Sequence, residues 1–153
     1  MNIIPYSELD ITILPGNHKR GSVVERACSN ITYGQFPPNN FGFPVGDIVL
    51  KLGYCGFGPS KKGATGLRHI WDKHHKEIGL SCPSEIPCFI ETVIKQGSSV
   101  LIDHGKSTDK PLVLSSSTGM AILCQKVSQN RNIYEIITAY TRRQHPGTVI
   151  ATL

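Results

Sequence analysis

The residue types best suited to acid–base chemistry gather in one short segment, residues 65–76, which reads TGLRHIWDKHHK. The segment holds three histidines together with one arginine and two lysines. Histidine titrates near neutral pH, so its side chain can both take and give protons. Arginine and lysine bind phosphate oxygens. Residues of these types can therefore transfer protons and hold anionic groups.

The segment is predicted to be a helix, because Thr65 is a plausible N-cap and Gly79 follows the last turn. At about 100° per residue, His74 falls within the apolar stripe, whereas His69 and Lys73 fall on the opposite, polar side. The two histidines are therefore expected on different faces. His69 lies in the first turn, where the helix N-terminus disfavours a positive charge, and a neutral imidazole can act as a general base.

Each of these residues also has an ordinary structural interpretation. His74 can be a hydrogen-bonded core histidine, and His69 and Lys73 can belong to a solvated basic face. A zinc site is not indicated, because two ligating histidines on a helix need i, i+4 spacing and His69 aligns with Lys73 instead. We expect no metal and no other cofactor.

A second polar group ends the stretch 132–143, NIYEIITAYTRR, which alternates as a β-strand does. One face of this strand is predicted to carry Tyr134, Ile136, Thr138, Tyr140 and Arg142. Its end thus presents a hydroxyl, a phenol and a guanidinium, which can hold a phosphate and the charge that develops on it. The same residue types are also common where a strand runs out to solvent.

The elements that would position these groups begin near residue 45. GDIVLKLGY (46–54) is typical of a strand, and SEIPCFIETVIKQG (84–97) has the apolar spacing of a second helix. Four strand-like stretches follow, separated by short turns, so neighbours must pair antiparallel. The predicted fold class is α+β, with two helices packed on a four- to five-stranded antiparallel sheet.

The loop between the first strand and the first helix, YCGFGPSKKGATG (54–66), is rich in glycine and carries Lys61 and Lys62. It lacks the GxxxxGK[ST] order of a P-loop, so a nucleotide cradle is not expected. Two lysines in such a loop can also be simply flexible and solvated.

Residues 1–42 are interpreted as an irregular N-terminal arm, because NITYGQFPPNNFGFP (30–44) is dense in proline, glycine and asparagine. Within the arm, DITIL (10–14) suggests a short strand and SVVERAC (22–28) a short helix. The length fits one folded domain, which we expect over residues 43–153.

Composition narrows the class of protein further. The formal charge of +5 fits a polyanionic partner without requiring one. The five cysteines include no CxxC pair, so reduced thiols are expected, with a Cys82–Cys88 disulfide as the alternative in a secreted protein. No stretch has the roughly 20 apolar residues of a membrane span, and no signal peptide is visible.

The combination of GLRHIWDKH (66–74) and YEIITAYTRR (134–143), with a second helix and a strand meander between them, resembles the barnase/EndoU/colicin/RelE ribonuclease superfamily. The resemblance covers about residues 43 to 145 and is strongest to its phage and bacterial toxin branches, including toxin domains of contact-dependent growth inhibition. It implies metal-independent cleavage of RNA, with tRNA as the expected substrate, to a 2′,3′-cyclic phosphate and a 5′-OH.

The resemblance also implies roles for particular residues. The catalytic group would be His69, His74, Thr138 and Tyr140. The substrate-binding group would be Lys61, Lys62, Arg68, Lys73 and Arg142. Which histidine is the base and which the acid stays open.

A toxin of this kind would act in the bacterial cytoplasm, after delivery from another cell as part of a longer secreted effector. Its producer would need an immunity protein, and charge complementarity favours an acidic one. The alternative is a non-catalytic RNA- or protein-binding module on the same fold, although the sheet offers few aromatic side chains for base stacking. A protein-modifying transferase is a third class, but no Gly-rich nucleotide fingerprint supports it.

Overall fold

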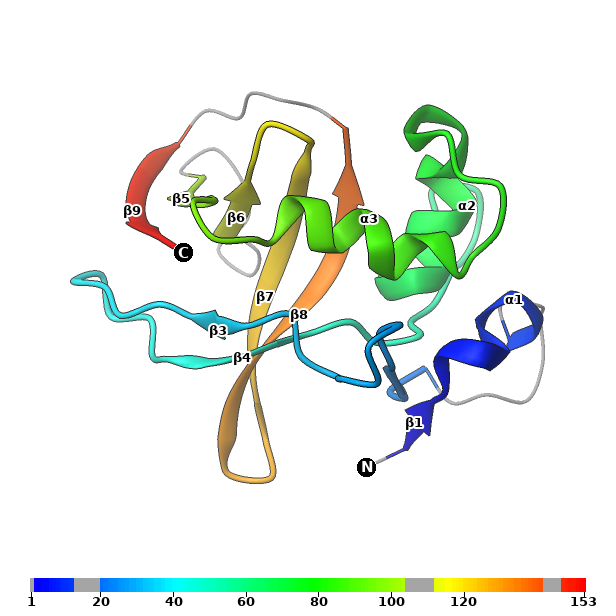
Figure 1. The fold of residues 1–153 in the computed structure, drawn as a ribbon, viewed down its shortest axis with the longest axis horizontal. Helices are drawn as coiled ribbons and strands as arrows, with labels where there is room; N and C mark the ends of the chain where they lie inside the picture. Colours follow the sequence, from blue (N-terminus) through cyan, green and yellow to red (C-terminus); the bar gives the residue numbers. More distant parts are fainter. Residues whose placement is uncertain (1, 13–19, 104–111, 142–146) are drawn as a thin grey trace.

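The computed structural model describes residues 2–12, 20–103, 112–141 and 147–153. Within these ranges the chain forms a curled seven-stranded mixed sheet, three short helices and a separate two-stranded pair (Figure 1). The helices are α1 (Leu9–Thr12), α2 (Gly66–Ile78) and α3 (Glu85–Val93), and a 3-10 turn spans Tyr6–Glu8. The large sheet has the order β3 (Gln35–Phe36), β4 (Gly46–Val49), β8 (Arg131–Tyr140), β7 (Met120–Ser128), β6 (Leu112–Ser115), β5 (Ser99–Ile102) and β9 (Thr148–Thr152). The pair consists of β1 (Ile3–Ile4) and β2 (Val23–Val24).

The predicted fold, two helices on a four- to five-stranded antiparallel sheet, is wrong. The antiparallel meander from β5 to β8 is present as predicted. However, β4 pairs parallel with β8, β3 extends the sheet beyond β4, and β9 extends it beyond β5. Tight turns predict pairing only between strands that are neighbours in sequence. Strands β4 and β8 are separated in sequence by both helices and by β5, β6 and β7, and parallel pairing requires such a long connection.

The N-terminal region has little regular secondary structure, yet several of its apolar side chains are buried. Leu9, Val24 and Phe36 are fully buried in the main core. The strand expected at 10–14 is wrong, because residues 10–12, the described part of that stretch, lie in α1. The helix expected at 22–28 is wrong as well, because this stretch of the chain contains strand β2. The division of the chain between residues 42 and 43 stays a prediction.

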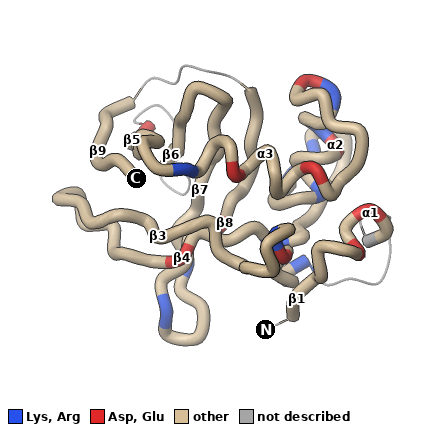
Figure 2. Tube along the Cα trace, in the orientation of Figure 1, with Lys and Arg blue, Asp and Glu red and all other residues tan. Residues whose placement is uncertain are grey.

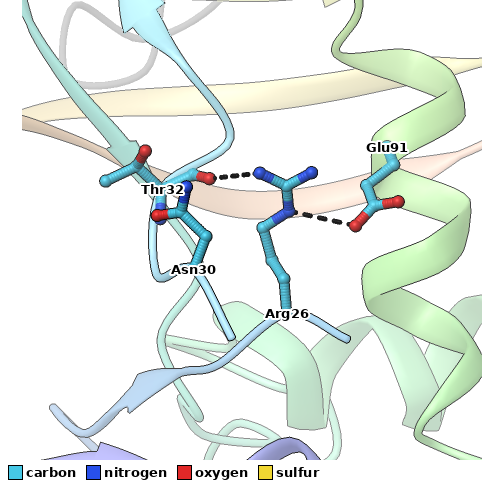
Figure 3. A network of polar contacts seen from close by, with 4 residues as sticks. All are labelled: Arg26, Asn30, Thr32 and Glu91. Atoms are coloured by element: carbon cyan, nitrogen blue, oxygen red, sulfur yellow. Dashed lines mark hydrogen bonds and ion pairs between the residues drawn. The ribbon is translucent and has the colours of Figure 1, made fainter. Parts of the chain in front are cut away.

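Arg26 ties this N-terminal region to α3 (Figure 3). Its Nε donates to a carboxylate oxygen of Glu91 at 3.0 Å, and its Nη1 donates to the carbonyl of Thr32 at 2.6 Å. The guanidinium also lies 5.0 Å from the centre of the Tyr33 ring. One side chain thus holds two chain segments and α3 together, with charge-assisted hydrogen bonds that are stronger than neutral ones.

Helix α2 has the predicted ends, but its N-terminus is held by a different device. Thr65 precedes the helix in an extended conformation and makes no side-chain cap bond. Instead, the N–H groups of Leu67 and Arg68 donate to the carbonyls of Lys51 and Leu52, both at 2.9 Å. Backbone carbonyls thereby satisfy helix donors that have no partner inside the helix. The start of α2 is fixed against the segment that follows β4.

A β-bulge in β8 decides which side chains reach which face of the sheet. Thr138 lies opposite Ile122 on β7, but the next β7 residue, Leu123, lies opposite Ile136, so Ile137 is the extra residue. The predicted common face for Tyr134, Ile136, Thr138 and Tyr140 is therefore wrong. Tyr134 and Ile136 join the main core, whereas Tyr140 joins a smaller cluster with Leu101, Val113 and Met120 on the other face.

All five cysteines lie in the described residues and are free thiols there. No helix in the described part of the chain is long and apolar enough to cross a membrane.

Candidate active site

Helix α2 lies beside the second half of β8 (Figure 1). Strand β4 pairs only with residues 133–135 of β8, so the edge of β8 beyond that point has α2 as its neighbour. A helix at a strand edge can contact side chains from both faces of the sheet. Leu67 and Ile70 pack into the main core, and His74 of the same helix approaches Tyr140.

The structure brings the two predicted histidines together. The ring centroids of His69 and His74 are 5.6 Å apart and the rings are perpendicular. The His74 ring lies 5.4 Å from the ring of Tyr140. The helical wheel places the two residues on different sides of α2, yet their rings meet, because the His74 side chain extends toward the N-terminal end of the helix, where His69 lies.

Glu77 completes this cluster, and the sequence analysis missed it. One of its carboxylate oxygens contacts Nδ1 of His74, and the other accepts a hydrogen bond from Oγ1 of Thr141 at 3.3 Å. A carboxylate only accepts, so Nδ1 of His74 is the donor in this contact. The signal was present as the i, i+3 spacing of His74 and Glu77, but it gains meaning only once Thr141 anchors the second oxygen.

Thr138 lies on the same face as Tyr140, because their partners on β7, Ile122 and Met120, alternate along an unbulged strand. Its Oγ1 is buried and has no hydrogen-bond partner in the described residues. An unsatisfied buried polar group costs about 1–3 kcal/mol. An ordered water, an ion or a ligand can supply such a missing partner.

The three predicted lysines differ in their position and in their contacts. Lys73 is exposed on α2, one turn after His69. Lys62 is exposed at the loop tip, and Lys61 pairs with Asp72 of α2 at 3.0 Å, which raises the pKa of the lysine. This ion pair holds the glycine-rich loop against the helix that carries the histidines.

Of the two predicted arginines, the structure describes Arg68. Arg68 is buried, and its Nη1 donates to the carbonyl of Gly53 at 3.4 Å, so it supports the loop. Arg142 lies outside the described residues. Among those residues, no group of three or more histidine, cysteine or acidic side chains gathers as a metal site, and metal independence stays a prediction.

Two neighbouring imidazoles, one of them beside the phenol of Tyr140, can therefore accept and donate protons. No protein-family model matches the chain, and no curated protein matches it either. The proposed function therefore rests on the contacts of His74 with His69, Tyr140 and Glu77.

Proposed function

We propose that this protein is an endoribonuclease that cleaves RNA without a metal ion, with tRNA as its expected substrate. The observation that carries the proposal is the pair of imidazoles, 5.6 Å apart, beside Tyr140 and the Glu77 carboxylate. Two proton transfers at neighbouring atoms are what cleavage of an RNA phosphodiester by its own 2′-hydroxyl requires.

In this reaction the 2′-oxygen forms a bond to phosphorus while the bond from phosphorus to the 5′-oxygen breaks. One imidazole takes the proton of the 2′-hydroxyl, and the other gives a proton to the departing 5′-oxygen. The products are a 2′,3′-cyclic phosphate and a 5′-hydroxyl. In this scheme the hydroxyls of Tyr140 and Thr138 and the ammonium of Lys73 stabilise the charge on the phosphorane oxygens.

Glu77 acts in this scheme as a positioning residue for His74. Its carboxylate fixes which ring nitrogen faces the substrate and stabilises the imidazolium that forms during turnover, as the buried carboxylate does in a catalytic triad. Thr141 holds the second carboxylate oxygen and so limits rotation of the Glu77 side chain.

We expect Glu77→Gln to lower kcat by on the order of ten- to a hundredfold with little change in KM. The amide keeps the size of the side chain and loses its charge. The measurement is steady-state cleavage of a short fluorogenic RNA across pH 5 to 9, since a change in His74 alters the shape of the pH profile. If the cleavage rate fell by the same factor at every pH, so that the shape of the profile stayed the same, Glu77 would have a purely structural role.

The toxin branch of the proposal adds a partner. The basic excess of +5 favours an acidic immunity protein that covers the catalytic cluster. In that setting the enzyme would act in the bacterial cytoplasm, after delivery as part of a longer effector.

The test of the reaction itself is incubation of the purified protein with total bacterial tRNA in EDTA. Fragments that end in a 2′,3′-cyclic phosphate support the proposal. Intact tRNA would reject cleavage of tRNA, and tight binding without cleavage would instead favour the alternative of a non-catalytic RNA-binding module.

A further inference from the structure

A second set of charged side chains lies on the same face of the sheet as Thr138 and Tyr140. On β7, Lys126 alternates in phase with Ile122 and Met120, which are the partners of Thr138 and Tyr140. On β8, Glu135 lies opposite Cys124 in that same phase. Directly paired residues of an antiparallel sheet point to the same face. The face that carries the catalytic hydroxyls therefore continues into a charged region.

Glu135 is the centre of this region. It is only 5% exposed, and its two carboxylate oxygens pair with the ammonium groups of Lys51 and Lys126, the latter at 3.0 Å. Lys126 itself is half-exposed. One carboxylate therefore fixes two lysines in place and leaves the group with a net positive charge.

The surface around these lysines is hollowed. A cavity of about 410 Å³ is lined by Lys51, Asp47 and Arg131, and a smaller one of about 170 Å³ by Lys51, Lys126, Glu135 and Arg20. Lys51 and Gly21 line both cavities, so they form one depression, which we call the lysine groove.

The charges of the groove are predominantly positive. Arg20 lies 3.7 Å above the ring of Tyr54, and Arg131 is largely exposed, with Asp47 at 3.7 Å. Four cations thus face two carboxylates. Figure 2 shows basic residues on the β7–β8 hairpin, whereas the region around α2 carries both basic and acidic residues.

We propose that the lysine groove binds the phosphates of the RNA strand that flank the cleaved bond. This inference rests on the proposed function. Tyr140 and Glu135 lie opposite Met120 and Cys124, which are four residues apart on β7, about 13 Å at 3.3 Å per residue, so a strand seated at the histidines reaches the groove within a few nucleotides. Lysines bind phosphates as point charges and read no sequence, so the groove contributes affinity and orientation.

The experiment measures binding separately from cleavage. The probe is a labelled single-stranded RNA whose 2′-oxygens are methylated, so that none can attack phosphorus. Its affinity is measured by fluorescence anisotropy from 50 to 200 mM salt for the wild type and for Lys126→Ala, Arg131→Ala and Lys95→Ala. Lys95 is an exposed lysine outside the groove and the histidine cluster, so Lys95→Ala is the matched control.

We expect Lys126→Ala and Arg131→Ala each to weaken binding several-fold and to make the slope of log K against log salt shallower by about 0.7, as loss of one phosphate contact does. Lys95→Ala should match the wild type. Lys51 is not substituted in this test, because its loss would leave the buried Glu135 with one partner fewer.

Glu135→Gln supplies a change in the opposite direction. It removes the charge that competes with phosphates for Lys51 and Lys126, so RNA should bind more tightly, provided that thermal unfolding shows the variant to be folded. If both alanine variants kept the wild-type affinity and salt slope, the proposal that the groove binds phosphates would be wrong, even if the protein cleaves RNA. Weakened binding in those variants, together with no cleavage by the wild type, would uphold the groove and reject the ribonuclease.

Discussion

Alanine at His74 or at His69 should reduce single-turnover cleavage of RNA by about 10²- to 10⁴-fold, the usual contribution of one general acid or base. The two rings form one unit, so the double variant should lose little more than the more damaging single variant. His75→Ala is the matched control on the same helix. The His75 ring stacks on Trp71 at 4.3 Å and contacts the Trp71 carbonyl, away from Tyr140, so its loss should leave the rate within a few-fold of the wild type.

The same variants can assign the acid and the base. In a substrate with sulfur in place of the bridging 5′-oxygen, the leaving group departs without a proton. The variant that lacks the acid should then recover most of its rate, whereas the variant that lacks the base should not. An equal loss in His75→Ala, or wild-type cleavage by His74→Ala, would remove the histidine pair from the mechanism.

The largest expected effect on stability is that of Phe36→Ala, at about 3–5 kcal/mol of unfolding free energy. Phe36 is fully buried, stacks on Tyr134 with ring centroids 4.1 Å apart, and lies 6.2 Å from the ring of Phe43. Its removal leaves a cavity between β3 and β8, beside Tyr134 in the first half of β8.

Phe41→Ala is the control, because it deletes the same atoms from a residue that is 51% exposed in the same N-terminal region. We expect it to change stability by less than about 0.5 kcal/mol. Urea unfolding followed by tryptophan fluorescence gives both values. If Phe36→Ala were as mild as Phe41→Ala, residues 1–42 would be an arm that the domain does not need, as the sequence suggested.

The local elements follow from the sequence because their signals are local. Apolar spacing between Thr65 and Gly79 predicts α2 within a residue at each end, and the turns between strands predict the β5–β8 meander. The candidate histidines could be named from their types alone. Their partner Glu77 could not, because its role depends on Thr141, 64 positions away along the chain.

The remainder was decided by tertiary structure, since long-range pairing leaves no periodic trace in a sequence. The parallel contact of β4 with β8 depends on where the chain returns after both helices, and the burial of Phe36 depends on an irregular segment that meets Tyr134. The bulge at Ile137 is one unpaired residue, yet it moves Thr138 and Tyr140 to the opposite face. Alternation within β8 alone cannot reveal it, because a bulge exists only relative to the partner strand. The residue types alone thus identified the side chains that are able to transfer protons. The packing of α2 against the edge of β8 decided which of these side chains are in contact.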